Sequence, residues 1–351
     1  MKKIAVIVFN LGGPDQLSSV EPFLFNLFSD RAIIDLPNPF RWMLAKFITN
    51  RRGPKARGIY EKIGGQSPLL DLTREQASAL EQSLNQSGDD QQFKTFVAMR
   101  YWHPMSDEVA GEVSNYGPDE IVLLPLYPQY STSTTGSSFA DWKRAAQNIG
   151  LKTTTKTICC YPQDQGWVDA QCALITKQID TCAGEKQPMR ILFSAHGLPK
   201  KIIDRGDPYQ WQVEQTCAAV MEKLNQHMPV EHRLCYQSRV GRLEWIGPSI
   251  DEELERAAKD NVGVIVVPIA FVSEHSETLV ELDIDYRKVA KDLNIPRYER
   301  VPAVATHELF IQGLGRLIHK AVHNNLEKNE NCCRGGSCRC QVNHTQCPNT
   351  E

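Results

Sequence analysis

The chain has 351 residues, of which 41% are hydrophobic and 23% are charged, and its formal net charge is -3. This length is sufficient to bury a large core and favours two domains of ordinary size. The composition excludes an intrinsically disordered chain, and the small net charge argues against a nucleic-acid partner. We therefore expect a globular protein.

The amino-terminal segment is apolar from Ile4 to Phe9 and then turns at Gly12-Gly13-Pro14. It lacks the small-residue cleavage site of a signal peptide, and a first β-strand explains it better. No apolar run approaches the ~20 residues that a membrane-spanning helix needs. We expect a cytoplasmic protein whose only membrane contact would be peripheral.

A long insertion follows the first strand, over about residues 15 to 90. It contains two aromatic-rich runs, Phe23–Phe28 and Phe40–Leu44, and the pair Arg51-Arg52. One interpretation is that these runs are ordinary core. The other is an apolar lip over a flat ligand, resting on a membrane with the arginines at the phosphate level. The sequence leaves both interpretations open.

Eight apolar runs predict β-strands, in two sets of four. The first set is Ile4–Leu11, Phe93–Met99, Ile121–Leu126 and Thr155–Cys160, and the second is Arg190–Ala195, Arg233–Gln237, Val262–Ile269 and Arg297–Val301. Helical patterns lie between the strands, for example at Thr73–Leu84, Tyr209–Asn225 and Ser249–Ala258. Nearly continuous apolar strands are typical of parallel sheets that helices cover on both faces. The predicted fold class is α/β, with two similar four-stranded parallel sheets flanked by helices.

The two halves of the chain resemble each other weakly, because each has a strand followed by a glycine- and proline-containing turn. We expect an N-terminal α/β domain over residues 1–152 and a C-terminal one over residues 153–305. A helix over residues 306–328 would pack back on the first domain, and residues 329–351 form a cysteine-rich extension. Chemistry is expected in loops at the carboxyl ends of the strands.

A histidine, His196, lies where a buried strand ends, next to a sharp turn at Gly197-Leu198-Pro199. In such a place a histidine is a structural residue about as often as a functional one. A functional histidine here would accept a proton or bind a metal, because neutral imidazole does both near neutral pH.

An acidic segment follows the strand that ends near Ile269. If the segment is an α-helix, then Glu277, Glu281 and Asp285 lie on one face at every fourth position. Like charges at this spacing destabilise a helix, and their placement favours a bound cation over a merely solvated face, which remains the alternative. Imidazole and carboxylate are ligands that Fe²⁺ accepts. We call these three carboxylates the acidic ladder, and we expect the ladder and His196 to face each other across an apolar slot.

Seven motifs, in order along residues 4 to about 320, resemble the ferrochelatase family. They are Leu11-Gly12-Gly13-Pro14, Ile63-Gly64-Gly65-Gln66-Ser67-Pro68, Arg100-Tyr101-x-His103-Pro104, Leu124-Pro125-Leu126-Tyr127-Pro128-Gln129-Tyr130-Ser131, Ser194-Ala195-His196-Gly197-Leu198-Pro199, Gln237-Ser238-Arg239-Val240-Gly241 and Glu274-His275-Ser276-Glu277-Thr278-Leu279-x-Glu281. The resemblance implies two Rossmann-like domains around a porphyrin cleft, and insertion of Fe²⁺ into protoporphyrin IX to give haem.

The resemblance also implies roles for individual residues. His196 matches the essential histidine and Glu277 its partner at the metal site, with His275 and Glu281 as supporting residues. An apolar Leu11 favours protoporphyrin over coproporphyrin as substrate. The remaining residues that line the porphyrin pocket or hold its propionates are Arg52, Tyr60, Ser67, Arg100, Tyr101 and Trp245.

Other functions stay open at this point. Within enzymes the alternative is a cobalt or nickel tetrapyrrole chelatase, and outside them a non-catalytic haem or iron–sulfur sensor. A dinucleotide-binding oxidoreductase is disfavoured, because Gly12-Gly13-Pro14 lacks the G-x-G-x-x-G spacing and proline cannot donate an N–H to a phosphate. Relatives that carry a cluster imply a homodimer.

The chain has eleven cysteines, and five of them lie near its end. By resemblance to members with a C-terminal extension, a [2Fe–2S] cluster would take Cys332 or Cys333 with Cys338 and Cys340. The fourth ligand would be Cys159 or Cys160, since Ser131-Thr132-Ser133 stands where animal-type members supply theirs. A zinc-binding tail and a tail of reduced thiols are the alternatives. The simplest interpretation of Cys172, Cys182, Cys217 and Cys235 is that they are small core residues.

Overall fold

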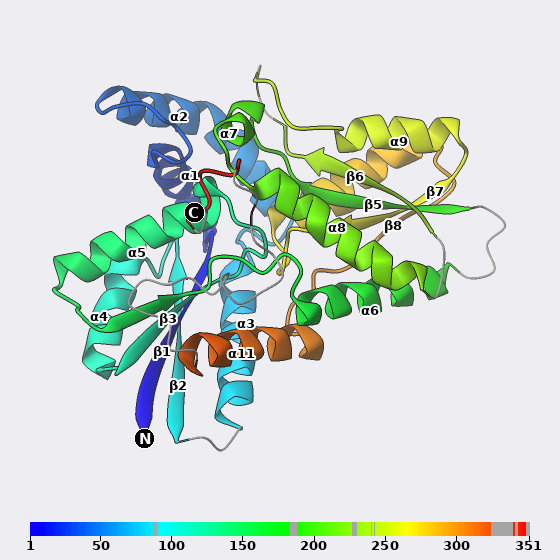
Figure 1. The fold of residues 1–351 in the computed structure, drawn as a ribbon. Helices are drawn as coiled ribbons and strands as arrows, with labels where there is room; N and C mark the ends of the chain where they lie inside the picture. The colour runs from blue at the N-terminus through cyan, green and yellow to red at the C-terminus, as the bar shows by residue number, and fades with distance from the viewer. Residues whose placement is uncertain are drawn as a thin grey trace. The chain divides into compact units, whose positions relative to one another are not determined.

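A computed structural model describes residues 1–86, 90–182, 188–226, 230–239, 241, 243–323, 340 and 343–348 (Figure 1). The chain forms two compact units. Unit 1 contains Met1–Cys160 and the second half of helix α11 (Glu308–His323), from Leu314 onward. Unit 2 contains Tyr161–Gly313 and the described residues from Cys340 onward.

Unit 1 is built on a four-stranded parallel sheet in the order β2-β1-β3-β4. Its strands are β1 (Lys2–Asn10), β2 (Gln91–Met99), β3 (Glu120–Pro125) and β4 (Thr154–Thr157). Its helices are α1 (Val20–Ser29), α2 (Phe40–Glu61), α3 (Leu69–Asn85), α4 (Ser106–Tyr116) and α5 (Ser137–Asn148), with a 3-10 turn at Leu17–Ser19 and a π-helical turn at Thr132–Gly136.

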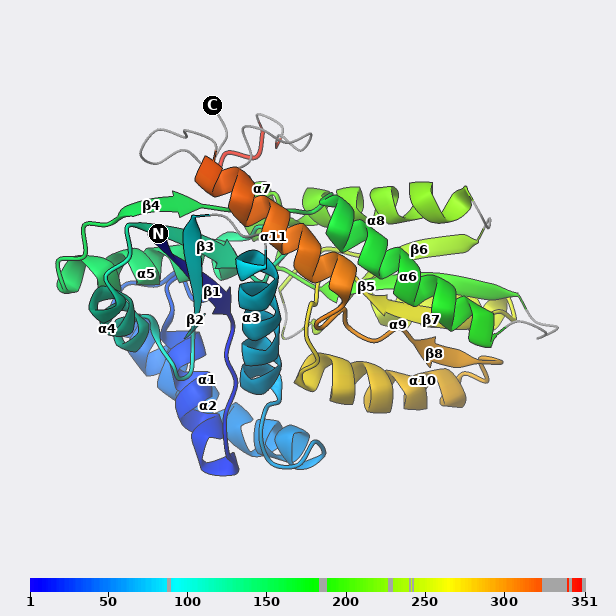
Figure 2. The ribbon, with the colours of Figure 1, turned by 90° about the horizontal axis from the view of Figure 1, so that it is seen from below.

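Helices cover both faces of this sheet, as its apolar central strand requires. On one face Ile7 and Phe9 pack against Val109 of α4 and Trp142 of α5. On the other lie α3 and the second half of α11 (Figure 2). There Lys156 at the end of the sheet donates a 2.9 Å hydrogen bond to a carbonyl near the end of α11.

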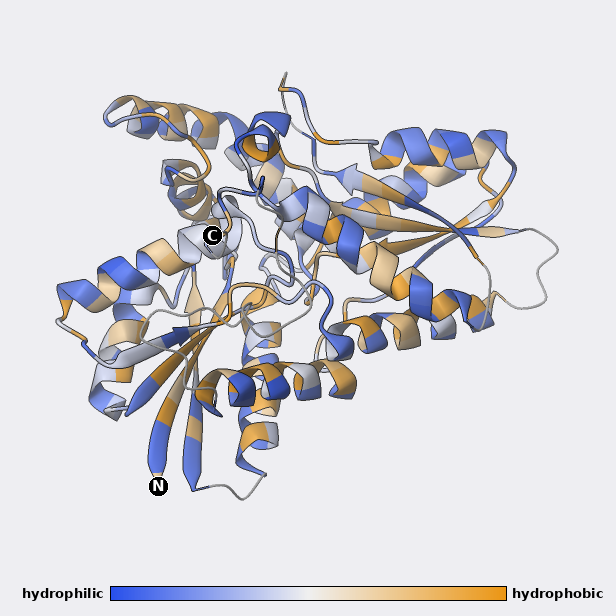
Figure 3. Ribbon diagram, viewed as in Figure 1, coloured by the Kyte–Doolittle hydropathy of each residue, from blue (hydrophilic) through white to orange (hydrophobic). Residues whose placement is uncertain are grey.

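Unit 2 has a second four-stranded parallel sheet, in the order β6-β5-β7-β8. Its strands are β5 (Met189–His196), β6 (Glu231–Gln237), β7 (Gly263–Pro268) and β8 (Tyr298–Arg300). Its helices are α6 (Gln165–Thr181), α7 (Lys200–Asp204), α8 (Tyr209–Asn225), α9 (Ile250–Lys259), the π-helix η3 (Glu277–Tyr286) and α10 (Arg287–Asp292). The helices α9, η3 and α10 pack on one face of the sheet, and Figure 3 shows its central strands as strongly hydrophobic.

The predicted fold class is confirmed, because both sheets are parallel and share one strand order. Two details of the prediction are wrong. The strand expected over Thr155–Cys160 ends at Thr157, and residues 158–160 continue as buried irregular chain. The acidic segment is the π-helix η3, and only the residues after Tyr286 form an α-helix.

The insertion contains both a buried apolar cluster and an exposed aromatic face. Phe23 and Leu24 of α1 are buried, with Val20, in an apolar cluster of unit 1. By contrast Phe40 and Phe47 of α2 are 63% and 60% exposed, and Trp42 and Met43 beside them are exposed as well. Among the residues that the structure describes, no helix is long and apolar enough to cross a membrane.

Candidate active site

The side chain of His196 projects from the carboxyl end of β5, where the strand meets a tight turn. Its Nδ1 lies 2.7 Å from the carbonyl oxygen of Gly197. A carbonyl oxygen only accepts, so Nδ1 carries the proton and Nε2 of the neutral ring has a free lone pair. A Cβ on Gly197 would lie 3.0 Å from the carbonyl oxygen of Gln237, so glycine permits this close approach. The hydroxyl of Tyr209 donates to the carbonyl of His196 at 3.1 Å and fixes the strand end.

The free nitrogen of His196 faces Glu277, the first residue of η3. The distance from Nε2 to the Glu277 Oε1 is 3.5 Å, and both side chains are about one-third exposed, at 37% and 32%. Strands β5 and β7 are neighbours in one sheet, and η3 follows β7, which brings the two residues together. The expected apolar slot between them is wrong, because 3.5 Å leaves no room for a macrocycle. They form one wall, with an imidazole lone pair next to a carboxylate.

His275 supports the start of η3. Its backbone N–H donates to the Thr278 hydroxyl at 3.0 Å, and its Nδ1 accepts from the backbone N–H of Glu277 at 3.1 Å. Its ring packs edge-on against Phe271, with centroids 4.6 Å apart. Removal from water lowers the pKa of His275, which keeps this imidazole neutral.

Glu281 lies behind Glu277 on η3 and is held by the end of β6. Its carboxylate accepts from the Ser238 backbone N–H at 2.9 Å, from the Ser238 hydroxyl at 2.6 Å and from Gln237 Nε2 at 3.0 Å. Burial raises the pKa of Glu281, and the neighbouring Glu277 raises it further. The carboxyl therefore holds its proton at a higher pH than an exposed glutamate does. The ladder continues to Asp285, which is exposed.

Gln237 links these groups and was not recognised as a site residue from its own position. Its Nε2 also donates to the Glu277 carbonyl at 3.1 Å, and its Oε1 accepts from the Ser194 hydroxyl at 2.7 Å. Ser238 next to it has a left-handed backbone, with φ 63°. The only signal in the sequence was the Gln237-Ser238-Arg239 motif, which pointed to the family and to no particular contact.

Arg100 and Tyr101 of unit 1 hold a buried carboxylate. Arg100 donates to the Ser137 hydroxyl at 2.7 Å and to Asp30 at 2.9 Å, and the Tyr101 hydroxyl donates to Asp30 at 2.8 Å. Burial pushes the pKa of Asp30 upward, but Arg100 and Ser137 outweigh it and the pKa is lowered. Tyr101 is fully buried. Two of the Arg100 donors are thus occupied within the protein.

The other predicted pocket residues lie in both units. Leu11 and Tyr60 share the apolar cluster of Phe23 and Leu24, and Ser67 approaches Gly13 so closely that a Cβ there would lie 2.5 Å from the Ser67 side chain. Arg52 lies over the ring of Phe28, 5.7 Å from its centroid, and burial lowers its pKa. In unit 2, Trp245 approaches Gly197, and its Nε1 is buried without a partner among the described residues.

The predicted cluster ligands are only partly within the described chain. Cys159 and Cys160 are buried in unit 1 beside Tyr130, with their sulfur atoms 3.4 Å apart. Cys340, in unit 2, accepts a hydrogen bond from Gln212 Nε2 at 3.1 Å. Cys332, Cys333 and Cys338 lie outside the described residues. Within the described ranges no three metal-binding side chains are grouped. The cysteines expected in the core are buried: Cys172, Cys182, Cys217 and Cys235.

The fold is that of the chelatases. SirB from Bacillus subtilis, solved with Fe³⁺, is similar with a TM-score of 0.53 over 92% of this chain and 97% of its own, at 11% identity. The sirohydrochlorin chelatase SirB from Bacillus subtilis subspecies spizizenii, solved with cobalt, is similar with a TM-score of 0.52 at 13% identity, over the same shares. At these identities the likeness defines the class of fold alone.

The sequence comparisons define the family within this class. The Ferrochelatase family model matches residues 3–322. The ferrochelatase of Pelagibacter ubique is 48% identical over 99% of this chain and 98% of its own. That of Wolbachia sp. subsp. Drosophila simulans is 52% identical over 90% and 98%, and that of Caulobacter vibrioides 47% over 99% and 97%. The chain belongs to the ferrochelatase family, the lyases of the terminal step of haem biosynthesis, as its motifs predicted.

Proposed function

We propose that this protein inserts Fe²⁺ into protoporphyrin IX, with His196 as the base that accepts the pyrrole protons. One observation carries the proposal: Nδ1 of His196 is committed to the Gly197 carbonyl, so that Nε2, 3.5 Å from Glu277, is the available lone pair. Metal insertion needs such a base, because the two pyrrole N–H bonds must break and release two protons as Fe²⁺ binds the four ring nitrogens.

Glu277 stabilises the imidazolium that forms when His196 takes a proton. A carboxylate at 3.5 Å is close enough to favour the charged ring. The same pair, one nitrogen and one oxygen donor, suits a transient contact with the incoming Fe²⁺. The pair of His196 and Glu277 thus serves both proton removal and metal delivery, since the protons leave and the cation arrives at the same place.

Glu281 and His275 complete the path for protons. The raised pKa of Glu281 suits a group that takes up and releases protons at a higher pH than an exposed glutamate does. From Glu281 the ladder leads to the exposed Asp285, where protons reach solvent. The neutral His275 holds the backbone N–H of Glu277 and so sets the direction of its side chain.

The family resemblance assigns porphyrin-binding roles to several residues. Arg52 is the best candidate for a propionate, because no hydrogen bond or ion pair holds its guanidinium within the described chain and its pKa is lowered by burial. Arg100 has fewer free donors. Leu11 offers an apolar contact, which favours protoporphyrin, and Tyr60, Ser67, Tyr101 and Trp245 would line or support the pocket.

The C-terminal cysteines would bind a [2Fe–2S] cluster, through Cys159 or Cys160, Cys332 or Cys333, Cys338 and Cys340. The cysteines of this set that lie within the described chain suit thiolate ligation. Cys159 is shielded from water, and the sulfur of Cys340 accepts an amide hydrogen bond of the kind that tunes the reduction potential of such clusters. When bound, such a cluster exchanges one electron. Absorption spectra of the oxidised and reduced protein, with iron, zinc and sulfide analysis, separate a cluster from bound zinc and from free thiols.

The exposed face of α2 supports a peripheral membrane contact, because Phe40, Met43 and Phe47 expose apolar side chains to water. Co-sedimentation with anionic vesicles tests this contact. Sedimentation velocity of the purified protein tests the homodimer that the family resemblance implies.

The activity is tested by anaerobic incubation of the purified protein with protoporphyrin IX and each of Fe²⁺, Co²⁺ and Ni²⁺. Haem formation with catalytic turnover is expected with Fe²⁺. Preference for Co²⁺ or Ni²⁺ would indicate the alternative chelatase, and binding of porphyrin without turnover would indicate a sensor.

A further inference from the structure

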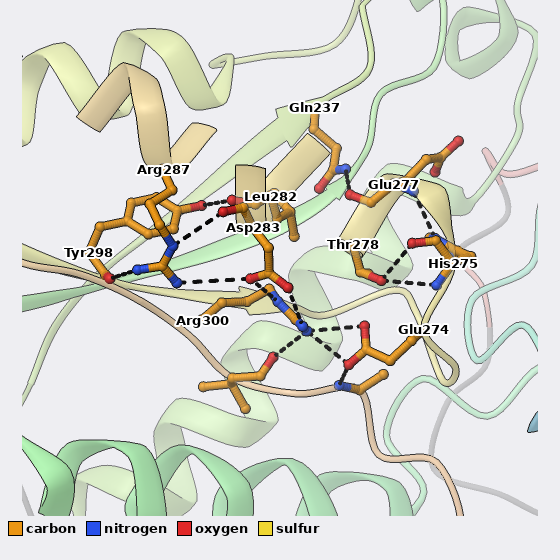
Figure 4. A network of polar contacts seen from close by, with 12 residues as sticks. Gln237, Glu274, His275, Glu277, Thr278, Leu282, Asp283, Arg287, Tyr298 and Arg300 are labelled. Atoms are coloured by element: carbon orange, nitrogen blue, oxygen red, sulfur yellow. Dashed lines mark hydrogen bonds and ion pairs between the residues drawn. The ribbon is translucent and has the colours of Figure 1, made fainter. Parts of the chain in front are cut away.

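Unit 2 contains a buried ionic cluster that the proposed mechanism does not use. Arg300, the last residue of β8, has a side chain only 10% exposed. Its Nε and Nη2 each donate at 2.7 Å to one oxygen of Asp283. Its Nη1 donates to both oxygens of Glu274, at 2.9 and 3.1 Å (Figure 4). One guanidinium therefore binds two carboxylates.

The cluster is well satisfied, which is the condition for keeping charges away from water. Glu274 also accepts from the Ala303 backbone N–H at 2.9 Å. Burial pushes the pKa of Glu274 upward, but Arg300 outweighs it and the pKa is lowered, so Glu274 is ionised. Arg287 lies 4.0 Å from Asp283 and adds a second positive charge. Two arginines thus neutralise two carboxylates, and both carboxylates are engaged in ion pairs.

The two carboxylates bracket the residues of the site along the chain. Glu274 directly precedes His275, and Asp283 lies two positions after Glu281. Between them lies most of η3, and π-helices of this length are rare because their backbone geometry is less favourable than that of an α-helix. Tyr298 of β8 adds a 2.8 Å hydrogen bond to the Leu282 carbonyl. Strand β8 thus holds both ends of the segment, and in Figure 4 the Glu277 carboxylate points away from Arg300.

We propose that Arg300 is a positioning residue for metal insertion. By binding Glu274 and Asp283 it fixes the segment between them and keeps Glu277 next to His196. This inference rests on the proposed function, since it assigns Arg300 a role in that reaction. Arg300 itself touches neither His196 nor Glu277 in the contacts of the described chain, so it acts through the backbone of η3. A misplacement of about 1 Å costs on the order of a hundredfold in rate when a catalytic group must be aligned.

The test compares Arg300→Met and Arg300→Lys with a matched control, Arg297→Met. Arg297 lies just before β8, pairs with Glu299 at 2.9 Å and donates to the Thr181 carbonyl at 3.4 Å, and both of these partners lie outside η3. Methionine removes both ion pairs. Lysine keeps the positive charge but not the planar set of guanidinium N–H donors, and one ammonium cannot bind two carboxylates in this geometry. The readouts are kcat and KM for Fe²⁺, porphyrin Kd, and hydrogen exchange of the amides in Glu277–Tyr286.

The expected result is faster amide exchange in η3 and a fall in kcat of about tenfold or more in both Arg300 variants, with porphyrin Kd unchanged. The control should match the wild type. If Arg300→Met does not fold, Arg300→Lys still decides, because its charge is retained. Faster amide exchange with unchanged kcat would overturn the positioning role and leave the proposed function standing. The same holds for a loss of total activity that is explained by a smaller amount of folded protein. Absence of iron insertion by the wild type would instead remove the proposed function.

Discussion

Substitution of Glu277 by glutamine removes the carboxylate beside His196 with little change in shape. At 3.5 Å a full charge pair is worth ~4.7 kcal/mol at an effective dielectric of ~20 and ~1.2 kcal/mol in bulk water. Both side chains are about one-third exposed, so screening favours the lower part of this range, about 1–2 kcal/mol. Because ~1.4 kcal/mol corresponds to a factor of ten, we expect Glu277→Gln to lower kcat by about five- to thirtyfold.

The assay is anaerobic steady-state haem formation, with porphyrin affinity measured separately by fluorescence quenching. The loss should fall on kcat, because the charge on His196 develops only as the proton is transferred. High salt should lower the wild-type rate toward that of the variant, since the pair is partly exposed. An unchanged kcat, or a defect that is seen only in porphyrin affinity, would refute the reasoning.

Two further predictions concern other groups. Arg52→Met should raise KM for protoporphyrin while kcat changes little. An equal rise in KM for a porphyrin ester, which has no free propionates, would contradict a propionate contact. The pKa of Glu281 is raised on folding, so the stability linked to its protonation is present below the usual glutamate range and is lost as pH rises through the folded pKa. Urea unfolding should therefore show a smaller loss of stability between pH 4 and pH 7 in Glu281→Gln than in the wild type, and equal losses would contradict the assignment.

The fold was largely predictable because its signals are local. Continuous apolar runs such as Val264–Val267 are needed wherever a strand is covered on both faces, and they recur in both units. The position of His196 followed from the same logic, since parallel strands end at a common edge. Conversely, the difference in exposure between α1 and α2 was not predicted, because both helices carry aromatic residues and only the folded packing separates Phe23 from Phe40.

The rest of the site depends on contacts between distant parts of the chain. Glu277 lies 3.5 Å from His196 because η3 follows β7, the neighbour of β5 in the sheet, whereas spacing alone suggested an α-helix facing a slot. Gln237 and Arg300 are ordinary polar residues in sequence, and their roles arise from partners such as Glu281 and Glu274, which lie 44 and 26 positions away. No periodicity encodes such pairs, so only the folded arrangement reveals them.

The central claim is that the imidazole of His196 takes the pyrrole protons. The most direct measurement is single-turnover iron insertion by His196→Ala with protoporphyrin prebound, followed by absorption under anaerobic conditions. We predict that the variant binds the porphyrin with near wild-type affinity and forms no haem. Haem formation at a rate close to that of the wild type would contradict the account.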